Sequence, residues 1–247
     1  MKYIQEFRDP EKAKFLLQGI EHLTQQLNAT AEKPIRLMEV CGGHTHTIFK
    51  FGLEELLPRG IDLIHGPGCP VCVLPMNRVD DCVSIAERED VILTTFGDAM
   101  RVPGSHKSLL QAKAAGQDIR MVYSPMDALQ LARINPERNV VFFGLGFETT
   151  MPGTAFTVLQ AKAEQIPNFF LFCNHITIIP TLRAILADSD LRLDGFIGPG
   201  HVSMIIGTEG YDFIASKHRK PFVVAGFEPL DILQSVWMLL KQFEEQR

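Results

Sequence analysis

Apolar residues in this chain come in short, nearly continuous runs rather than in alternation with polar residues. Such runs are typical of strands that are buried on both faces of a parallel sheet. The segments between most of them carry apolar residues at helical spacing, so we predict an α/β fold with right-handed crossovers. The predicted strands cover residues 35–40, 61–66, 91–97, 119–124, 139–145, 168–173, 193–198 and 221–227.

Helical patterns fill most of the remaining chain. The first thirty residues predict a helix in which Asp9 is the N-cap and Pro10 takes the first helical position. The other predicted helices cover residues 47–57, 76–87, 107–115, 125–133, 152–164, 178–187, 202–216 and 229–246.

Three strand-end loops of the first part of the chain match three loops of the second part, in the same order. The segments 39–47, 65–75 and 94–104 correspond to 144–152, 197–207 and 224–234. We therefore predict an N-terminal helix at 1–33 and two similar Rossmann-like domains with mainly parallel sheets, at 34–135 and 136–247. In such sheets ligands bind at the carboxyl ends of the strands, so loops of both halves would face a central cleft.

Composition and charge narrow the class of protein. The chain has 247 residues, of which 46% are hydrophobic and 21% charged, and its net charge is −5. An acidic protein lacks the basic field that a general nucleic-acid or anionic-membrane partner requires. No apolar run approaches the roughly 20 residues that span a bilayer, and no signal-peptide pattern is present. We expect a cytoplasmic protein with no nucleic-acid or membrane partner, whose five cysteines are usually reduced.

The segment "EVCGGHTH" places Cys41 directly after a predicted strand. Gly42 and Gly43 let the backbone turn sharply and leave the thiol unobstructed, and they are candidate cofactor-binding residues. A thiolate in this position could bind a soft metal or attack an electrophile. The alternative is a buried structural cysteine.

A second pair of cysteines, Cys69 and Cys72, lies in the segment "HGPGCPVC". The C-x-x-C spacing suits a redox pair or half of a zinc site. No second C-x-x-C and no paired-histidine motif accompanies it, which favours a redox pair or a pair that supports a metal held elsewhere. Cys82 and Cys173 fall within a helical pattern and a strand pattern, and we predict that both are core residues.

Four histidines are candidates for metal ligation or proton transfer. His44, His46 and His65 share loops with cysteines, and His201 takes the place of Cys69 in the matching loop. Neither a G-x-G-x-x-G nor a P-loop motif is present, so a nucleotide site is only weakly indicated.

Acidic residues and threonines also follow predicted strands. Asp98 and Glu148 lie at strand ends, as Glu228 does, and together they predict a polar cleft. The alternative is that each carboxylate caps the helix that follows it. Thr149 and Thr150 could likewise cap a helix or donate hydrogen bonds to a bound cofactor.

Several motifs taken together closely resemble the HypD family of hydrogenase-maturation proteins, along nearly the whole chain. They are "MEVCGGHTHTIFKFGL", "HGPGCPVCVLP", "TFGDAMRVPG", "YSPMDAL", "FFGLGFETTMP", "GPGHVSMIIG" and "VAGFEPLD". The resemblance implies a scaffold, rather than a classical turnover enzyme, on which the Fe(CN)₂CO group of [NiFe]-hydrogenases is assembled. It implies two partners, a HypC-type chaperone and a HypE-type cyanide carrier.

The resemblance also implies roles for individual residues. Cys41 would be the iron-binding thiolate, sharing the iron with a cysteine of the chaperone, and Cys69 and Cys72 would be a thioredoxin-like redox pair. His44, His46, Glu148 and His201 match family positions that line the cleft. Family members also carry a [4Fe–4S] cluster in a C-terminal segment, and ligands for it are absent from this chain. Two other hypotheses stay open, a thiol oxidoreductase that needs no iron and a non-catalytic partner-binding fragment.

Overall fold

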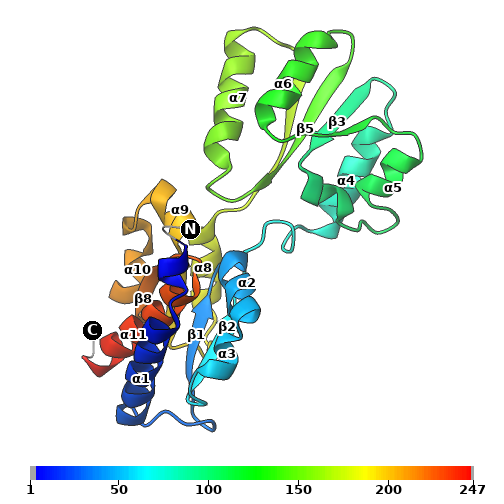
Figure 1. Cartoon of the computed structure of the whole chain (residues 1–247). Coiled ribbons are helices and arrows are strands. Elements are labelled where there is room, and N and C mark those ends of the chain that lie inside the picture. Colours follow the sequence, from blue (N-terminus) through cyan, green and yellow to red (C-terminus); the bar gives the residue numbers. More distant parts are fainter. Residues whose placement is uncertain (1–3, 246–247) are drawn as a thin grey trace. The chain divides into compact units, whose positions relative to one another are not determined.

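The computed structural model describes residues 4–245, which form two compact units (Figure 1). Unit 1 combines Met1–Cys69 with Ile179–Arg247, and unit 2 is the continuous segment Pro70–Ile178. Each unit contains a four-stranded parallel sheet with helices interleaved along the chain, which confirms the predicted α/β class. The units are not consecutive halves of the chain, because unit 1 is made of two separate segments. The boundary predicted at 135/136 lies inside unit 2.

The sheet of unit 1 has the strand order β2-β1-β7-β8. All its pairs are parallel, so the four carboxyl ends lie at one edge. The strands are β1 (Ile35–Glu39), β2 (Ile61–His65), β7 (Gly195–Pro199) and β8 (Phe222–Ala225). The helical elements of this unit are η1 (Gln5–Phe7), α1 (Pro10–Gln26), α2 (Gly42–Phe51), α3 (Leu53–Leu56), α8 (Ile178–Leu186), α9 (Gly200–Ile206), η3 (Glu209–Tyr211), α10 (Asp212–Ser216) and α11 (Pro229–Glu244).

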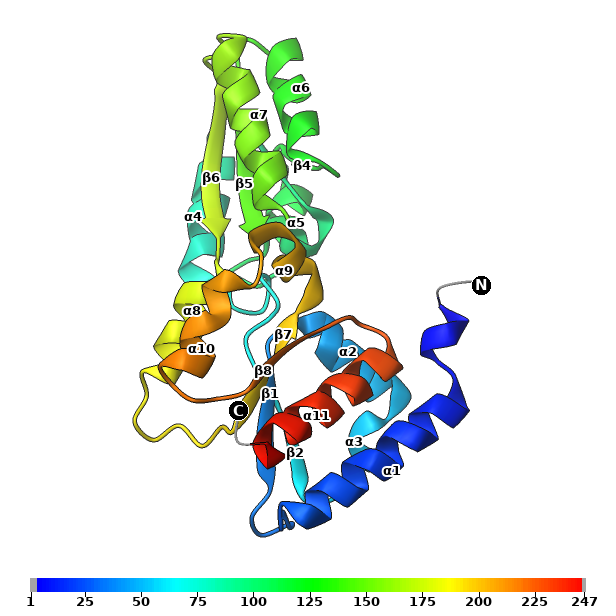
Figure 2. The ribbon, with the colours of Figure 1, turned by 90° about the vertical axis from the view of Figure 1, so that its left-hand side faces the viewer.

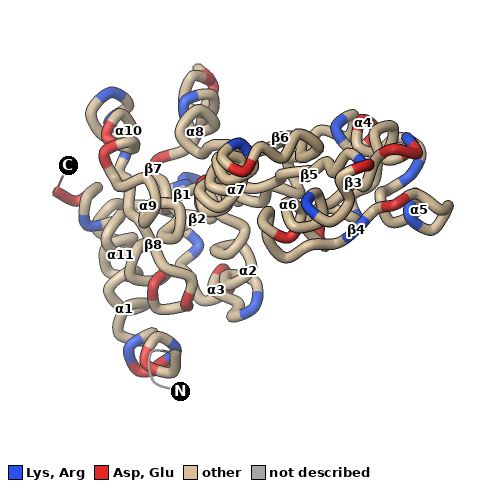
Figure 3. Tube along the Cα trace, turned by 90° about the horizontal axis from the view of Figure 1, so that it is seen from above, with Lys and Arg blue, Asp and Glu red and all other residues tan. Residues whose placement is uncertain are grey.

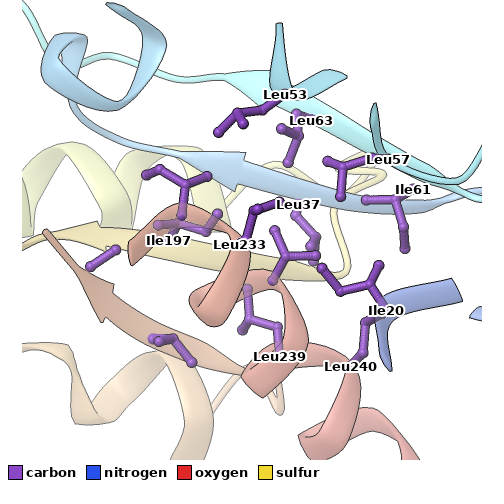
Figure 4. Close-up of a cluster of buried hydrophobic side chains, with 14 of the residues drawn as sticks. Ile20, Leu37, Leu53, Leu57, Ile61, Leu63, Ile197, Leu233, Leu239 and Leu240 are labelled. Carbon is purple, nitrogen blue, oxygen red and sulfur yellow. The ribbon is translucent and has the colours of Figure 1, made fainter. Parts of the chain in front are cut away.

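The main core of unit 1 lies between the sheet and the helices α1 and α11. Ile20 of α1 and Leu233 of α11 pack with Leu37 of β1 and Ile197 of β7 (Figure 4). Figure 2 shows α1, α3 and α11 on one side of these strands and α8 and α10 on the other. Asp9 caps α1 as predicted, because its carboxylate accepts hydrogen bonds from the N–H groups of Glu11 and Lys12.

The sheet of unit 2 has the strand order β4-β3-β5-β6, again with all pairs parallel. The strands are β3 (Val91–Thr95), β4 (Ile119–Met121), β5 (Asn139–Gly146) and β6 (Phe169–His175). The helical elements are α4 (Met76–Ala86), η2 (Gly97–Arg101), α5 (Leu109–Ala114), α6 (Pro125–Ile134) and α7 (Met151–Ala163).

The central strands of unit 2 are buried on both faces, as their apolar runs predict. All of β3 is buried, and successive residues of β5 belong to different cores. Phe143 packs in the cluster that includes α4 and α5, whereas Phe142 packs against α6. Figure 1 shows α6 and α7 on one face of this sheet and α4 and α5 on the other.

Two predicted helices differ from those observed. The helix predicted at 47–57 begins at Gly42 instead, so the Gly-Gly-His segment after β1 is its first turn. The helix predicted at 202–216 is broken after Ile206, where Gly207 takes a φ of 73° that ends α9. All eight predicted strands overlap observed ones.

Charged residues of both signs are interspersed along both units (Figure 3). Within residues 4–245, no helix is long and apolar enough to cross a membrane.

Candidate functional site

The four strands of unit 1 bring the residues that follow them to one edge of the sheet. Cys41 follows β1, Gly68 lies in the loop after β2, His201 belongs to the start of α9 after β7, and Phe227 follows β8. The carboxyl edge of a parallel sheet is where α/β proteins bind ligands. The site therefore takes residues from both chain segments of unit 1.

Cys41 is the N-cap of α2, with an extended backbone. Its side chain is buried, and the residue is 6% exposed. Burial raises the pKa of the Cys41 thiol, while the N–H groups of Gly43 and His44 oppose that rise because they favour the thiolate. Burial therefore favours the protonated thiol in the free protein.

The side chain of His201 lies next to the Cys41 sulfur. Its Nδ1 lies 3.9 Å from Cys41 Sγ. The His201 ring packs on Phe227, with ring centroids 5.1 Å apart. Phe227 also covers Gly43, where an added Cβ would lie 2.7 Å from the ring. The close approach of Phe227 to α2 therefore requires a glycine at position 43.

His44 lies on the first turn of α2 and is fully buried. Its ring centroid is 5.0 Å from that of Phe227, and its Nε2 lies 3.3 Å from the carbonyl oxygen of Ala225. Its Nδ1 lacks a hydrogen bond in the described part of the chain. Burial lowers the pKa of His44, so the ring is neutral near pH 7.

The loop of Cys69 lies directly against Cys41. The N–H of Gly42 donates to the carbonyl oxygen of Gly68 over 3.1 Å. An added Cβ on Gly68 would lie 2.3 Å from Cys41 Cα, and one on Gly42 would lie 3.6 Å from Cys69 Cβ. The glycines of these two loops thus allow the backbones to approach closely, and they place Cys69 beside the start of α2.

Cys69 and Cys72 are both disulfide-bonded, and the other three cysteines are free, so the bond joins these two. Cys69 is half-buried and Cys72 is exposed. Cys82 is a core residue, as predicted, and burial raises the pKa of its thiol far above the usual range. The same prediction for Cys173 is wrong, because this residue lies on edge strand β6 and is exposed.

One residue of this site was not identified from sequence, the fully buried Glu39 at the end of β1. Its Oε2 accepts a hydrogen bond from the N–H of Cys41 at 2.9 Å. Its Oε1 accepts one from the hydroxyl of Thr45 and lies 2.9 Å from His65 Nδ1. Its position within "MEVCGG", next to a run of apolar strand residues, was the available signal.

The remaining candidates lie elsewhere. His46 is exposed, since residues two apart on a helix do not share a face with one another. In unit 2, Asp98 of η2 is exposed, and it lines the same surface pocket as Cys72.

Glu148 and its neighbours follow β5 in unit 2. Glu148 is buried, and its Oε1 accepts a hydrogen bond of 2.6 Å from the N–H of Ile178, whereas its Oε2 has no partner among the described residues. The hydroxyl of Thr150 donates to the carbonyl oxygen of Phe147 at 3.1 Å, and Thr149 is half-buried. Glu148 therefore binds the first N–H group of α8 and does not cap α7, the helix that follows it, so the capping alternative does not hold for this residue.

A resident metal site is not evident in residues 4–245. No group of three or more His, Cys, Asp or Glu side chains there could hold a metal ion. A metal at Cys41 would therefore need further ligands from outside this chain's described residues.

Comparison with known proteins identifies the relatives of this chain. The family described as "HypD: Hydrogenase formation hypA family" matches residues 13–247. The chain belongs to the HypD family. The hydrogenase maturation factor HypD of Rhodobacter capsulatus is 64% identical over 247 residues, and that of Escherichia coli is 62% identical over 242 residues.

The chain covers less than the whole of these relatives. It spans 66% of the Rhodobacter capsulatus protein and 65% of the Escherichia coli protein, although 100% and 98% of this chain align. A solved structure of an ABC domain in complex with L-Trp from Streptococcus pneumonia covers 86% of this chain and 83% of its own, at 10% identity. Its TM-score of 0.17 is too low to bear on fold or ligand.

Proposed function

We propose that this chain acts in the maturation of [NiFe]-hydrogenases, in the cytoplasm, as a scaffold for assembly of the Fe(CN)₂CO group. A HypC-type chaperone and a HypE-type cyanide carrier would be its partners. Membership of the HypD family supports the process. The observation that carries the proposed site is Cys41, a buried thiol at the start of α2 with His201 3.9 Å from its sulfur.

A single thiolate suits iron that must later be passed on. Iron is here the cargo of the protein, and a thiolate is a good ligand for low-valent iron. With one ligand from this chain and one from the partner, coordination positions stay open for cyanide and carbon monoxide. The lack of a three-ligand group among residues 4–245 is consistent with such a shared site.

In this proposal Cys69 and Cys72 supply redox support. Opening their disulfide takes up two electrons, and closing it returns them. Cys69 lies beside Gly42, the residue that follows Cys41. Because Cys69 lies beside the backbone next to Cys41, the redox state of the pair can affect the surroundings of the iron-binding thiol.

The test is Cys41→Ser in the complex with a HypC-type partner. We expect iron content and the infrared bands of metal-bound CN and CO to fall by at least about ten-fold, because a serine hydroxyl is a poor ligand for this iron. Cys173→Ser, which replaces an exposed free cysteine of unit 2, is the matched control and should retain the bands. Unchanged bands in the Cys41 variant would disprove the assignment.

The disulfide itself favours a second candidate, a thioredoxin-like thiol oxidoreductase. In that case Cys69→Ser would abolish turnover of disulfide substrates, while Cys41→Ser would retain it and no iron would be needed. Partner capture without iron or cyanide incorporation would instead identify a non-catalytic binding fragment.

A further inference from the structure

Unit 2 contains a surface pocket of about 460 Å³ next to the disulfide. Apolar side chains such as Leu74, Met76 and Val102 form much of its lining, together with Cys72. Its size lies within the range of small-molecule sites, roughly 300–1,000 Å³. The pocket is therefore large enough for a ligand of about the size of a tripeptide.

Two opposite charges also line this pocket. Asp98 and Arg101 are both exposed residues of η2, three positions apart. Within residues 4–245, neither side chain has an ion-pair partner. The pair can thus accept an ammonium group on one side and a carboxylate on the other, in a site that is otherwise apolar.

The two sulfurs of the disulfide have different surroundings. Cys72 is exposed and lines the pocket, whereas Cys69 is half-buried with its Cβ beside Gly42. Gly42 is the first residue of the ten-residue helix α2, and the N-terminal end of a helix stabilises negative charge. Access thus favours attack on Cys72, and the surroundings of Cys69 favour its departure as a thiolate.

We propose that this pocket binds a small peptide thiol that carries both an ammonium and a carboxylate group, and that the thiol opens the disulfide at Cys72. The inference rests on the redox role proposed for Cys69 and Cys72. It adds to that role a reductant class and a direction of attack.

The disulfide is opened in two successive thiol–disulfide exchanges. The ligand thiolate forms a bond to Cys72 Sγ, the bond between Cys72 and Cys69 breaks, and its electron pair stays on Cys69 Sγ. A second thiolate then attacks the ligand sulfur of the mixed disulfide and releases Cys72 as a thiolate. Two ligand thiols are oxidised to one disulfide, and the protein disulfide gains two electrons and two protons.

The direction of attack is tested with two variants of the full chain, each of which replaces one cysteine of the pair. Oxidised glutathione is the probe. In Cys69→Ser, we expect Cys72 to form the mixed disulfide, as measured by mass spectrometry. In Cys72→Ser, Cys69 should react at least about ten-fold more slowly, since access limits thiol exchange. Equal rates, or a faster reaction at Cys69, would overturn the proposed direction.

The pocket is tested with Arg101→Gln in the otherwise unchanged oxidised chain. We expect reduction by glutathione to slow about five-fold relative to reduction by uncharged 2-mercaptoethanol, because an exposed charge pair contributes up to about 1 kcal/mol. Arg88→Gln, an exposed position outside this pocket, should leave the ratio unchanged. Neither outcome depends on Cys41 or on iron, so failure here is distinct from failure of the scaffold proposal.

Two results would contradict the pocket proposal. One is an Arg101→Gln variant with the same ratio as the unchanged chain. The other is a glutathione rate that rises linearly with concentration without saturation, which would indicate collision with an exposed disulfide and no binding.

Discussion

Glu39 shows how one buried carboxylate positions the residues of the site. It contacts the N–H of Cys41 and the hydroxyl of Thr45 on α2, and it also contacts His65 at the end of β2. His65 in turn lies 3.1 Å from Glu54 of α3. The carboxylate thereby ties the end of one strand to the first turn of the following helix and to the neighbouring strand. Glu39 positions Cys41 by accepting a hydrogen bond from its backbone N–H, not by a hydrogen bond to the thiol.

We expect Glu39→Gln to lower the free energy of unfolding by about 1–3 kcal/mol, because an amide cannot accept every hydrogen bond that the buried carboxylate accepts. Urea unfolding followed by circular dichroism measures the change. Glu54→Gln removes an exposed carboxylate that contacts the same histidine, and it should cost less than about 0.5 kcal/mol. Equal costs for the two variants would contradict the positioning role. Alkylation of Cys41 should also change in rate in Glu39→Gln only.

At the scale of elements, the starts of the strands in unit 2 are held by a charge cluster. Asp118, directly before β4, pairs with Arg120 at 2.7 Å and with Arg138 at 2.6 Å. Arg138 also donates to the carbonyl oxygen of Val91 in β3. The hydrogen bond from Arg120, followed by that from Arg138, lowers the pKa of Asp118 to about 2. One carboxylate thus links the starts of three neighbouring strands.

The sign of the pH dependence follows from this lowered pKa. Since the pKa of Asp118 in the folded state lies below the unfolded value of about 3.9, the stabilisation is complete above about pH 4. It is lost as pH falls from about 4 to about 2. We expect Asp118→Asn to lower the free energy of unfolding by about 1 kcal/mol at pH 7, a value reduced for solvent screening. Below about pH 2 the variant and the unchanged chain should be equally stable. Urea unfolding at several pH values measures both, and a cost that does not depend on pH would contradict the assignment.

At the scale of the whole molecule, the chain leaves unit 1 after β2, forms all of unit 2, and then returns to complete unit 1. Both sheets have the same strand order. If the four strands of each sheet are numbered along the chain, that order is 2-1-3-4 in both, β2-β1-β7-β8 and β4-β3-β5-β6. The fold therefore repeats, but the repeat is not a division of the chain into consecutive halves. Unit 2 is continuous, whereas the core of unit 1 needs both of its segments.

This organisation predicts which fragments fold. Residues 70–178 expressed alone should unfold cooperatively in urea, because both faces of their sheet are covered from within the segment. Residues 1–69 alone should not, because β7, β8 and α11 supply much of their core. Circular dichroism and denaturant titration distinguish the two. Cooperative folding of 1–69, or its absence in 70–178, would contradict the division.

The sequence by itself determined most of the helices and strands and singled out the candidate thiols. Continuous apolar runs identify strands such as β3 and β5, since burial on both faces removes the apolar–polar alternation of a half-exposed strand. The pattern around Cys41 and the C-x-x-C spacing of Cys69 and Cys72 identified the thiols, because cysteine chemistry depends on local residue type.

Only the tertiary structure decided how these parts combine. Strand pairing joins residues far apart in the sequence, so local patterns could not show that β1 pairs with β7. Nor could they show that unit 2 is inserted in the sequence between the two segments of unit 1. They also could not separate Cys82 from Cys173, because a strand pattern does not reveal whether the strand lies at an edge of its sheet. Likewise, Glu39 has no motif of its own. Its role arises from contacts with Cys41, with Thr45 on α2 and with His65 on β2, which come together only when the sheet has formed.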